Sequence, residues 1–153
     1  DQGTKWWILK IVMQPPRVIP LTPFFNLVLG WNRGVSFGLF NSDSALNLWL
    51  LPVLALAIVA ALLVWLRRVD GLVLGCAIGM VIGGAVGNII DRLFRNQQAV
   101  ADFLDFHFAG YHWPAFNLAD AGITVGAMIL IIDSLFMKPE KPKNNQGREQ
   151  SDT

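Results

Sequence analysis

The sequence is poor in the residues that most often build metal and redox sites. It contains one cysteine, Cys76, and two histidines, His107 and His112, among 153 residues. A single thiol excludes an internal disulfide and any zinc site that needs two or more thiolates, and two histidines in a predicted loop are too few for a zinc peptidase. The sequence also has no HExxH, GxSxG or glycine-rich phosphate-binding motif. Hydrolytic chemistry in this chain would therefore have to come from carboxylates.

Charge is scarce as well. Only 15% of the residues are charged, the net charge is +1, and the twelve lysines and arginines are spread along the chain. Such a distribution gives no indication of a nucleic-acid-binding surface. Apolar residues make up 54% of the chain and the mean hydropathy is +0.47, which is too high for a water-soluble domain of this length. These values predict a membrane protein.

Three apolar stretches are each near the roughly 20 residues that a helix needs to cross the hydrocarbon core. They run over about 45–66, 72–90 and 118–137. Pro52 lies in the opening turns of the first stretch, where a missing N–H costs little. We therefore expect residues 1–137 to form one membrane-embedded domain. Residues 138–153 are charged and poor in apolar side chains, which predicts a disordered cytoplasmic tail.

Basic residues next to the spans predict the orientation of the chain. Arg67 and Arg68 follow the first span, and three lysines of the tail follow the third, so the positive-inside rule places these ends in the cytoplasm. Two arginines at the end of the second span oppose this signal. Residues 1–44 and 93–117 are then expected to face outward.

The outward segments read as more than connectors. Residues 17–40 hold β-branched and aromatic residues between prolines and glycines, which predicts short strands lying on the membrane surface. Four tryptophans lie near the expected span boundaries, as in an interfacial aromatic belt. They are Trp6, Trp7, Trp49 and Trp113.

The second span carries a regular glycine pattern. Gly75, Gly79, Gly83 and Gly87 recur every four residues and therefore share one face of a helix. Small residues on one face let a neighbouring backbone approach closely. The pattern thus predicts a ridge of close helix packing.

Polar residues follow this ridge at the end of the same span. Asn88, Asp91 and Arg92 lie within about one turn, with Asn88 and Arg92 four apart on one face. Such groups are costly near hydrocarbon unless they pair or face water. Two interpretations of Asp91 remain open, a surface charge at the interface or a member of a buried polar site.

Acidic residues also lie between the second and third spans. Asn117 fits an N-cap and Asp120 fits the third helical position, so capping explains these two when they are taken alone, and a surface loop explains Asp102. Together, however, Asp102 and Asp120 flank one short outward segment, which can bring them face to face, whereas Asp105 is a nearby competitor. Two close carboxylates share a proton and can act as acid and base in the hydrolysis of a peptide bond.

Two other function classes fit the same residues. A proton-coupled transporter would also use intramembrane Asp, Asn and Arg, but near the bilayer midplane and in broken helices. A non-catalytic lipid-binding or assembly protein would keep the glycines and tryptophans but would tolerate Asp102→Asn. The depth of the carboxylates and the effect of this substitution separate the three classes.

Five sequence blocks, in order, resemble the lipoprotein signal peptidases (signal peptidase II), which are aspartic proteases of the bacterial inner membrane. The blocks are DQGTK at 1–5, NRGVSFG at 32–38, GGAVGNIIDR at 83–92, VADF at 100–103 and FNLAD at 116–120. One block alone would be weak, but the ordered set spans nearly the whole chain and is specific.

The resemblance implies a site and a reaction. Asp102 and Asp120 would be the catalytic pair, although which of them acts as the base stays open because a shared proton moves between them. The substrate would be a prolipoprotein whose cysteine already carries diacylglycerol, cut just before that cysteine, and no metal or organic cofactor is implied. The residues that would line the site are Asn32, Gly84, Asn88, Arg92, Asn117 and Asp1.

The resemblance also implies a fold and a setting. The expected fold class is an all-α membrane protein, a bundle of transmembrane helices with a small extracytoplasmic β-sheet or cradle and a periplasmic loop. Family members have four spans, the first of which ends at the DQ block, so we expect a truncated sequence with three complete spans. The expected setting is the bacterial inner membrane, with the active site near the outer face, contact with membrane lipids, no nucleic-acid partner and a monomeric state.

Overall fold

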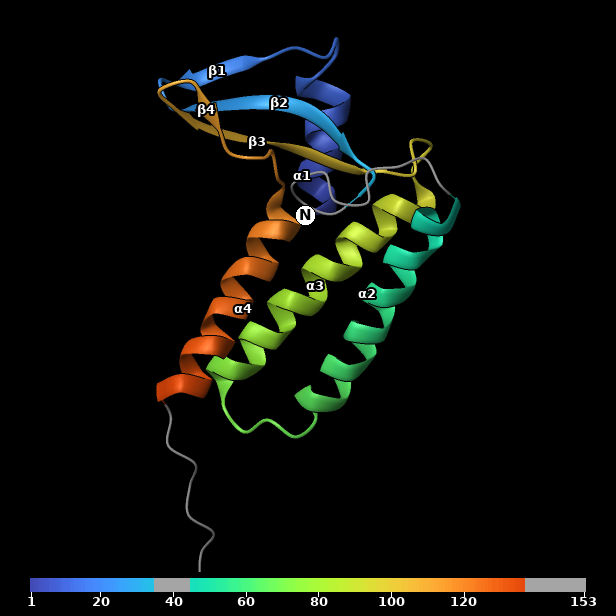
Figure 1. Ribbon diagram of the computed structural model, residues 1–153, viewed down its shortest axis with the longest axis vertical. Coiled ribbons are helices and arrows are strands. Elements are labelled where there is room, and N and C mark those ends of the chain that lie inside the picture. The colour runs from blue at the N-terminus through green and yellow to red at the C-terminus, as the bar shows by residue number, and fades with distance from the viewer. Residues whose placement is uncertain (35–44, 137–153) are drawn as a thin grey trace, which may run out of the picture.

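Three long helices run side by side, and a small sheet lies across one of their ends (Figure 1). This architecture comes from a computed structural model that describes residues 1–34 and 45–136. The expected tail at 138–153 and the end of the stretch 17–40 lie outside the described residues. The elements are α1 (Gln2–Trp7), the π-helix η1 (Ile8–Val12), β1 (Ile19–Thr22), β2 (Phe25–Asn32), α2 (Ala45–Leu66), α3 (Leu72–Phe94), β3 (Val100–Phe108), β4 (Tyr111–His112) and α4 (Leu118–Phe136).

Three of the helices, α2, α3 and α4, are long and apolar enough to cross a membrane, which confirms the three predicted spans. The second span is longer than predicted, since α3 continues to Phe94. Pro52 lies inside α2 rather than in its opening turns, because the helix already begins at Ala45. The chain is thus a multi-pass membrane protein.

Two glycines let α3 and α4 pack closely. A Cβ atom added at Gly126 of α4 would lie 2.6 Å from the Ala77 carbonyl oxygen of α3. A Cβ atom added at Gly84 of α3 would meet the backbone of Ala119 and lie 2.7 Å from Ile123 Cγ1. Neither contact could accept a side chain without a backbone shift.

The predicted glycine ridge is largely wrong as a helix contact. Among the described residues, a Cβ atom at Gly79 or Gly83 would meet nothing within 4 Å, and one at Gly75 would only reach Leu66 Cδ1 at 4.0 Å. Within this series only Gly87 is crowded, and its neighbour is the Asp1 side chain at 2.6 Å. Period-four spacing shows that residues share a face, but not which face meets a neighbour.

The fold is not purely all-α, because β1 to β4 form an antiparallel sheet in that order. The segment between α3 and α4, expected as a loop, contains β3 and β4, so Asp102 lies on a strand, and His107 and His112 face each other as a strand pair. The acids interrupt an otherwise apolar run, VADFLDFHF, that is buried over most of its length. Burial of both faces hides the alternation by which a strand is normally recognised.

A small apolar core joins the sheet to the beginning of the chain. Ile8, Met13 and Phe103 are almost fully buried and pack with partly buried leucines and other aliphatic side chains of β1, β2 and β3. This contact fixes α1 and η1 beneath the sheet, beside the end of α3 (Figure 1).

Candidate active site

The sheet brings Asp102 and Asn117 together. Phe116, just before α4, exchanges two backbone hydrogen bonds with Leu104 of β3. The Phe116 N–H donates to the Leu104 carbonyl oxygen at 3.1 Å, and the Leu104 N–H donates to the Phe116 carbonyl oxygen at 2.8 Å. The next residue, Asn117, therefore lies beside Asp102. From the other side, β2 pairs Gly30 with Asp102, which leaves Asn32 within reach of the same carboxylate.

The Asp102 carboxylate is buried, with 3% of the residue exposed. Its Oδ1 accepts a hydrogen bond from Asn117 Nδ2 at 2.6 Å, and its Oδ2 accepts one from Asn32 Nδ2 at 3.1 Å. Burial raises the pKa of Asp102 to about 6; the bond from Asn117 opposes this shift, and the negative charge of Asp120 adds to it. Asp102 therefore changes its charge close to neutral pH.

Asp120 lies in the first turn of α4, and its position follows from local capping. Asn117 Oδ1 accepts from the backbone N–H groups of Ala119 at 2.8 Å and Asp120 at 3.2 Å, while Asp120 Oδ2 accepts from the Asn117 N–H at 3.2 Å. This reciprocal arrangement is the capping geometry predicted from FNLAD. It stabilises the helix start and holds one Asp120 oxygen in place.

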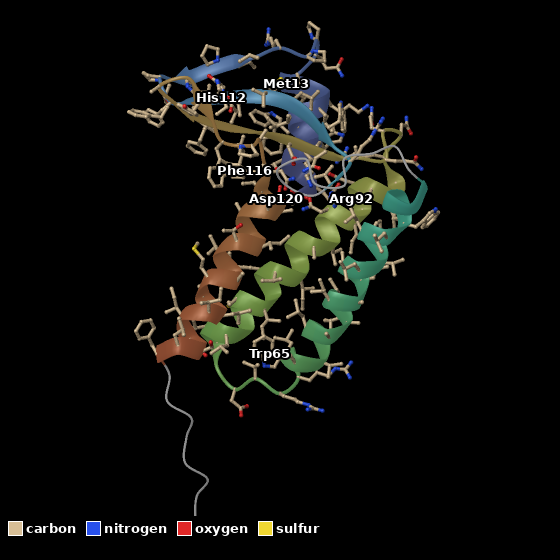
Figure 2. All side chains as sticks on the ribbon, viewed as in Figure 1. Met13, Trp65, Arg92, His112, Phe116 and Asp120 are labelled. Atoms are coloured by element: carbon tan, nitrogen blue, oxygen red, sulfur yellow. The ribbon has the colours of Figure 1, made fainter. Side chains whose placement is uncertain are left out.

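Asn117 also links the two carboxylates. Its side-chain amide donates to Asp102 and its backbone N–H donates to Asp120. Within the described part of the chain, the two carboxylates are not hydrogen-bonded to each other directly. The other Asp120 oxygen, Oδ1, accepts from Asn88 Nδ2 of α3 at 2.8 Å. Asp120 and Arg92 thus lie where the helices meet the sheet (Figure 2).

A buried ion cluster supports Asn88 from behind. Lys5 is fully buried, and its Nζ lies 2.9 Å from Asp1 Oδ2, 2.9 Å from Asp91 Oδ2 and 3.0 Å from Asn88 Oδ1. Asp91 is also fully buried and pairs with Arg95 Nε at 2.7 Å. The alternative of Asp91 as a surface charge is therefore wrong.

Sequence reasoning did not assign Lys5, Gln2 or Arg95 to this cluster. Gln2 Nε2 donates to Asp91 Oδ1 at 2.9 Å and to the Gly87 carbonyl oxygen at 2.9 Å. The available signal was Lys5 itself, a lysine four residues after an aspartate in an apolar setting. Its main partner, Asp91, is distant in sequence, so no local pattern pairs them.

Of the remaining predicted site residues, Asp1 and Arg92 lie at the polar network and Gly84 lies in a helix contact. Asp1 belongs to the polar network, since its Oδ1 accepts from the Ala119 N–H at 3.1 Å. Arg92 lies beside the network and donates from Nη2 to the Gly34 carbonyl oxygen at 2.9 Å, while its buried Nε has no partner in the described residues. Gly84 instead contributes to the contact between α3 and α4.

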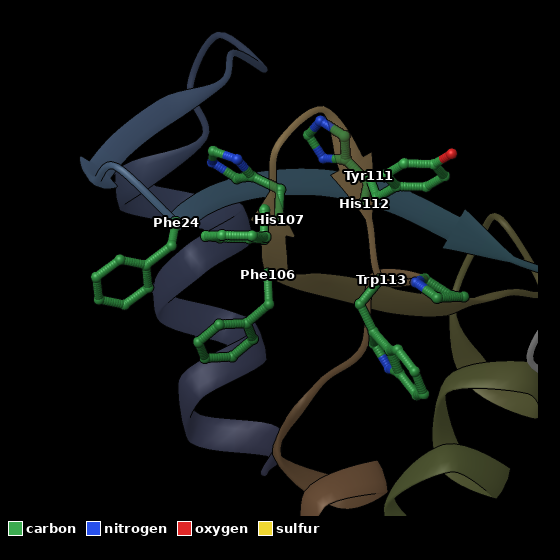
Figure 3. A pocket seen from close by; sticks show the side chains of 8 residues that line it. Phe24, Phe106, His107, Tyr111, His112 and Trp113 are labelled. Atoms are coloured by element: carbon green, nitrogen blue, oxygen red, sulfur yellow. The ribbon is translucent and has the colours of Figure 1, made fainter.

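Asp120 opens onto an apolar groove beside α4. The groove measures about 360 Å³ and is lined by Trp113, Pro114, Ala115, Phe116, Asp120, Ala121, Thr124 and Val125. Trp113 and Pro114 also line a second, aromatic pocket of about 670 Å³ on β3 and β4 (Figure 3). In this view Phe106 and Trp113 point to one side of the sheet, and His107, His112 and Tyr111 lie toward the other. An apolar surface thus continues from the sheet to the Asp120 carboxylate.

The other acid of β3, Asp105, is held apart from the pair. Asn26 Nδ2 donates to its Oδ2 at 2.9 Å, and His112 Nδ1 lies 2.9 Å from its Oδ1. Burial opposes the charge of Asp105, but the bonds from His112 and Asn26 outweigh burial and lower its pKa. Asp105 therefore ties three strands together as an ionised group.

The fold and the site define a class of protein: a multi-pass membrane protein with two carboxylates, joined through one asparagine, at the end of its helix bundle. The sequence model of the family described as signal peptidase (SPase) II matches residues 1–136. The chain belongs to this peptidase family.

Named relatives agree with the family match. The lipoprotein signal peptidase of Methylorubrum extorquens (strain PA1) is 42% identical over 149 residues, which cover 95% of this chain and 84% of the relative. That of Ralstonia nicotianae (strain ATCC BAA-1114 / GMI1000) is 48% identical over 137 residues, which cover 88% of this chain and 77% of the relative. A bacterial membrane enzyme solved by the in meso method at 2.3 Å resolution superposes with a TM-score of 0.75 at 28% identity, over 100% of this chain and 87% of that one. These relatives favour the peptidase over the transporter.

Proposed function

We propose that this chain is an aspartic signal peptidase that cleaves lipid-modified prolipoproteins just before the lipidated cysteine. The observation that carries the proposal is the pair Asp102 and Asp120, joined through Asn117, with Asp120 open to an apolar groove. A pair of carboxylates beside an apolar groove is the arrangement that a membrane-embedded aspartic peptidase requires.

The charges around the pair favour one proton on the two carboxylates. Three cations, Lys5, Arg92 and Arg95, lie with four carboxylates, Asp1, Asp91, Asp102 and Asp120. One proton on the pair makes this cluster neutral, which a low-dielectric setting favours.

The reaction then proceeds as general acid and base catalysis. The ionised carboxylate takes a proton from water as the water oxygen attacks the scissile carbonyl carbon, and the neutral carboxyl gives its proton to the carbonyl oxygen. When the tetrahedral intermediate collapses, the C–N bond breaks, the carboxyl that took the proton from water gives it to the departing amine, and a hydroxyl of the intermediate returns its proton to the other carboxylate as the C=O bond forms again. Arg92 Nε has no partner in the part of the chain that the structure describes, and it is suited to bind a substrate carbonyl.

The groove suits a substrate that arrives within the bilayer. Its lining is apolar apart from Asp120 and Thr124, so lipid-bearing or apolar peptide segments can approach Asp120 without crossing water. Asn32 of β2 and Arg92 of α3 flank Asp102 and Asn88 and are proposed to hold the peptide backbone. The substrate class itself follows from the names of the relatives.

The proposed setting is the bacterial inner membrane, with the site near the outer face. The link between α2 and α3, which follows Arg67, lies at the opposite end of the bundle from the sheet (Figure 1), and the positive-inside rule favours the cytoplasm for it. The monomeric state and the domain limits 1–137 and 138–153 remain predictions.

The test is cleavage of a diacylglyceryl-modified precursor by the full-length protein in detergent or liposomes, followed by mass spectrometry. We expect a product that begins at the lipidated cysteine, no cleavage of the unmodified precursor, and loss of cleavage in Asp102→Asn and in Asp120→Asn. Full turnover by either folded variant would refute the acid pair.

A further inference from the structure

The side-chain amide of Asn88 has only one orientation that fits its surroundings. Its Oδ1 faces two donors, Lys5 Nζ at 3.0 Å and Asn117 Nδ2 at 3.5 Å, and its Nδ2 faces Asp120 Oδ1 at 2.8 Å. An ammonium group can only donate, and an ionised carboxylate can only accept. A flipped amide would set donor against donor at Lys5 and acceptor against acceptor at Asp120.

We infer that Lys5 is a positioning residue: it holds Oδ1 of Asn88, turns the amide NH₂ toward Asp120, and so assigns Asp120 as the proton acceptor and Asp102 as the proton donor. This inference rests on the proposed aspartic peptidase activity. Lys5 touches neither carboxylate of the pair and acts through Asn88.

The two acids differ in ways that agree with this assignment. Asp120 receives the Asn88 NH₂, lies at the positive end of the α4 dipole, and opens onto the groove from which water and substrate arrive. All three features favour the use of Asp120 as the base. Asp102 accepts amide bonds from Asn117 and Asn32, which favour its charge, but it is only 3% exposed on a strand, and burial outweighs these bonds in favour of the neutral form.

Other charged groups surround the chain of contacts from Lys5 through Asn88 to Asp120. Lys5 is flanked by Asp1 at the start of α1 and by Asp91 of α3. Asp120 faces Lys5, Arg92 of α3 and Asp102 of β3. Asp91 binds Lys5 and Arg95 but not Asn88. A substitution at Asp91 therefore removes an ion pair of Lys5 and leaves the bond from Lys5 to Asn88 in place.

The experiment measures how kcat/KM for the lipid-modified precursor depends on pH. The acidic limb of this profile, where the rate rises with pH, reports the base of the free enzyme. Lys5→Met removes the donor that orients Asn88, so ionised Asp120 loses support and the acidic limb moves to higher pH by roughly one unit, about tenfold in rate below the limb. In an Asn88→Ala background, Lys5→Met should move the limb less than in the wild type, because only the direct effect of the Lys5 charge on Asp120 is then lost. A limb that stays in place in folded Lys5→Met, or that moves equally in both backgrounds, would overturn the inference.

The matched control is Asp91→Asn, which breaks an ion pair of Lys5 but leaves its bond to Asn88. We expect lower thermal stability and a limb that stays in place or moves to lower pH, because one negative charge is removed. If Asp91→Asn instead moves the limb upward as Lys5→Met does, the role of Lys5 is only structural.

A second variant covers the case in which Lys5→Met does not fold. Asn88→Asp keeps an acceptor for Lys5 but removes the donor to Asp120 and adds a like charge, so cleavage should fall by about a hundredfold or more. Wild-type rates and limb in Asn88→Asp would overturn the inference. Absence of cleavage by the wild-type protein would overturn the proposed function as well, whereas normal cleavage with an unmoved limb would overturn only the role of Lys5.

Discussion

Asp102→Asn should abolish cleavage and, at the same time, stabilise the folded protein at neutral and alkaline pH. Asp102 is 3% exposed, and burial raises its pKa from 3.8 to about 6. The folded protein therefore favours the neutral side chain, and ionisation of Asp102 costs folding free energy. Asparagine is neutral at every pH and keeps a carbonyl oxygen that can accept from Asn117, while its NH₂ would face Asn32 Nδ2, so that the bond from Asn32 is lost.

The magnitude and its pH window follow from the two pKa values. A carboxyl whose pKa is higher in the folded state contributes stability that is fully present below about pH 4 and is lost as the pH rises through about 6. A shift of about two units corresponds to roughly 3 kcal/mol. The variant should thus exceed the wild type in free energy of unfolding by up to about 3 kcal/mol at pH 8, and the difference should vanish toward pH 4.

The assay is thermal or denaturant unfolding in detergent between about pH 4 and pH 8, in parallel with the cleavage assay. Asp105→Asn is the matched control, because the pKa of Asp105 is lowered in the fold. Its substitution should destabilise the protein at neutral pH, and the loss should shrink as the pH falls through the lowered pKa of Asp105. Equal pH dependence of the two variants, or an Asp102→Asn variant less stable than the wild type at pH 8, would refute this reasoning.

Three further predictions concern Asn117, the glycines and the pH profile. Asn117→Ser keeps an N-cap but is too short to reach Asp102, so cleavage should fall at least about tenfold with little loss of stability, whereas Asn117→Ala should lose about a further 1 kcal/mol in denaturation experiments. Gly126→Ala, which would crowd the Ala77 carbonyl oxygen, should destabilise by about 1–3 kcal/mol, and Gly79→Ala, which meets open space, should be neutral or stabilising. With Asp102 as the proton donor, kcat/KM should decline as the pH rises above about 6, because Asp102 then ionises; a rate that stays flat to pH 8 would contradict its role as donor.

The sequence was sufficient where the physical cause is local. Long apolar stretches specify the three helices because hydrocarbon thickness sets their length, and FNLAD specifies its cap because Asn117 and Asp120 are three residues apart. The candidate site residues came from ordered blocks and not from geometry.

Features that depend on distant contacts could not be predicted. The pairing of Lys5 with Asp91 joins residues far apart in the chain, and the close approach of α3 to α4 uses Gly84 and Gly126 rather than the regular glycine series. The sequence predicts a loop at Asp102, because its strand is buried on both faces and lacks the usual alternation of apolar and polar residues. In each case tertiary packing, which no short pattern records, decides the outcome.

The buried Lys5 also has a consequence for biogenesis, because its partner Asn88 lies 83 positions later and Asp91 later still. During synthesis the lysine emerges long before α3, and until α1 docks each charge keeps only its local partner, Asp1 for Lys5 and Arg95 for Asp91. Chains in which α1 has not docked onto α3 therefore carry two separate ion pairs beside hydrocarbon, and docking merges them into one buried cluster.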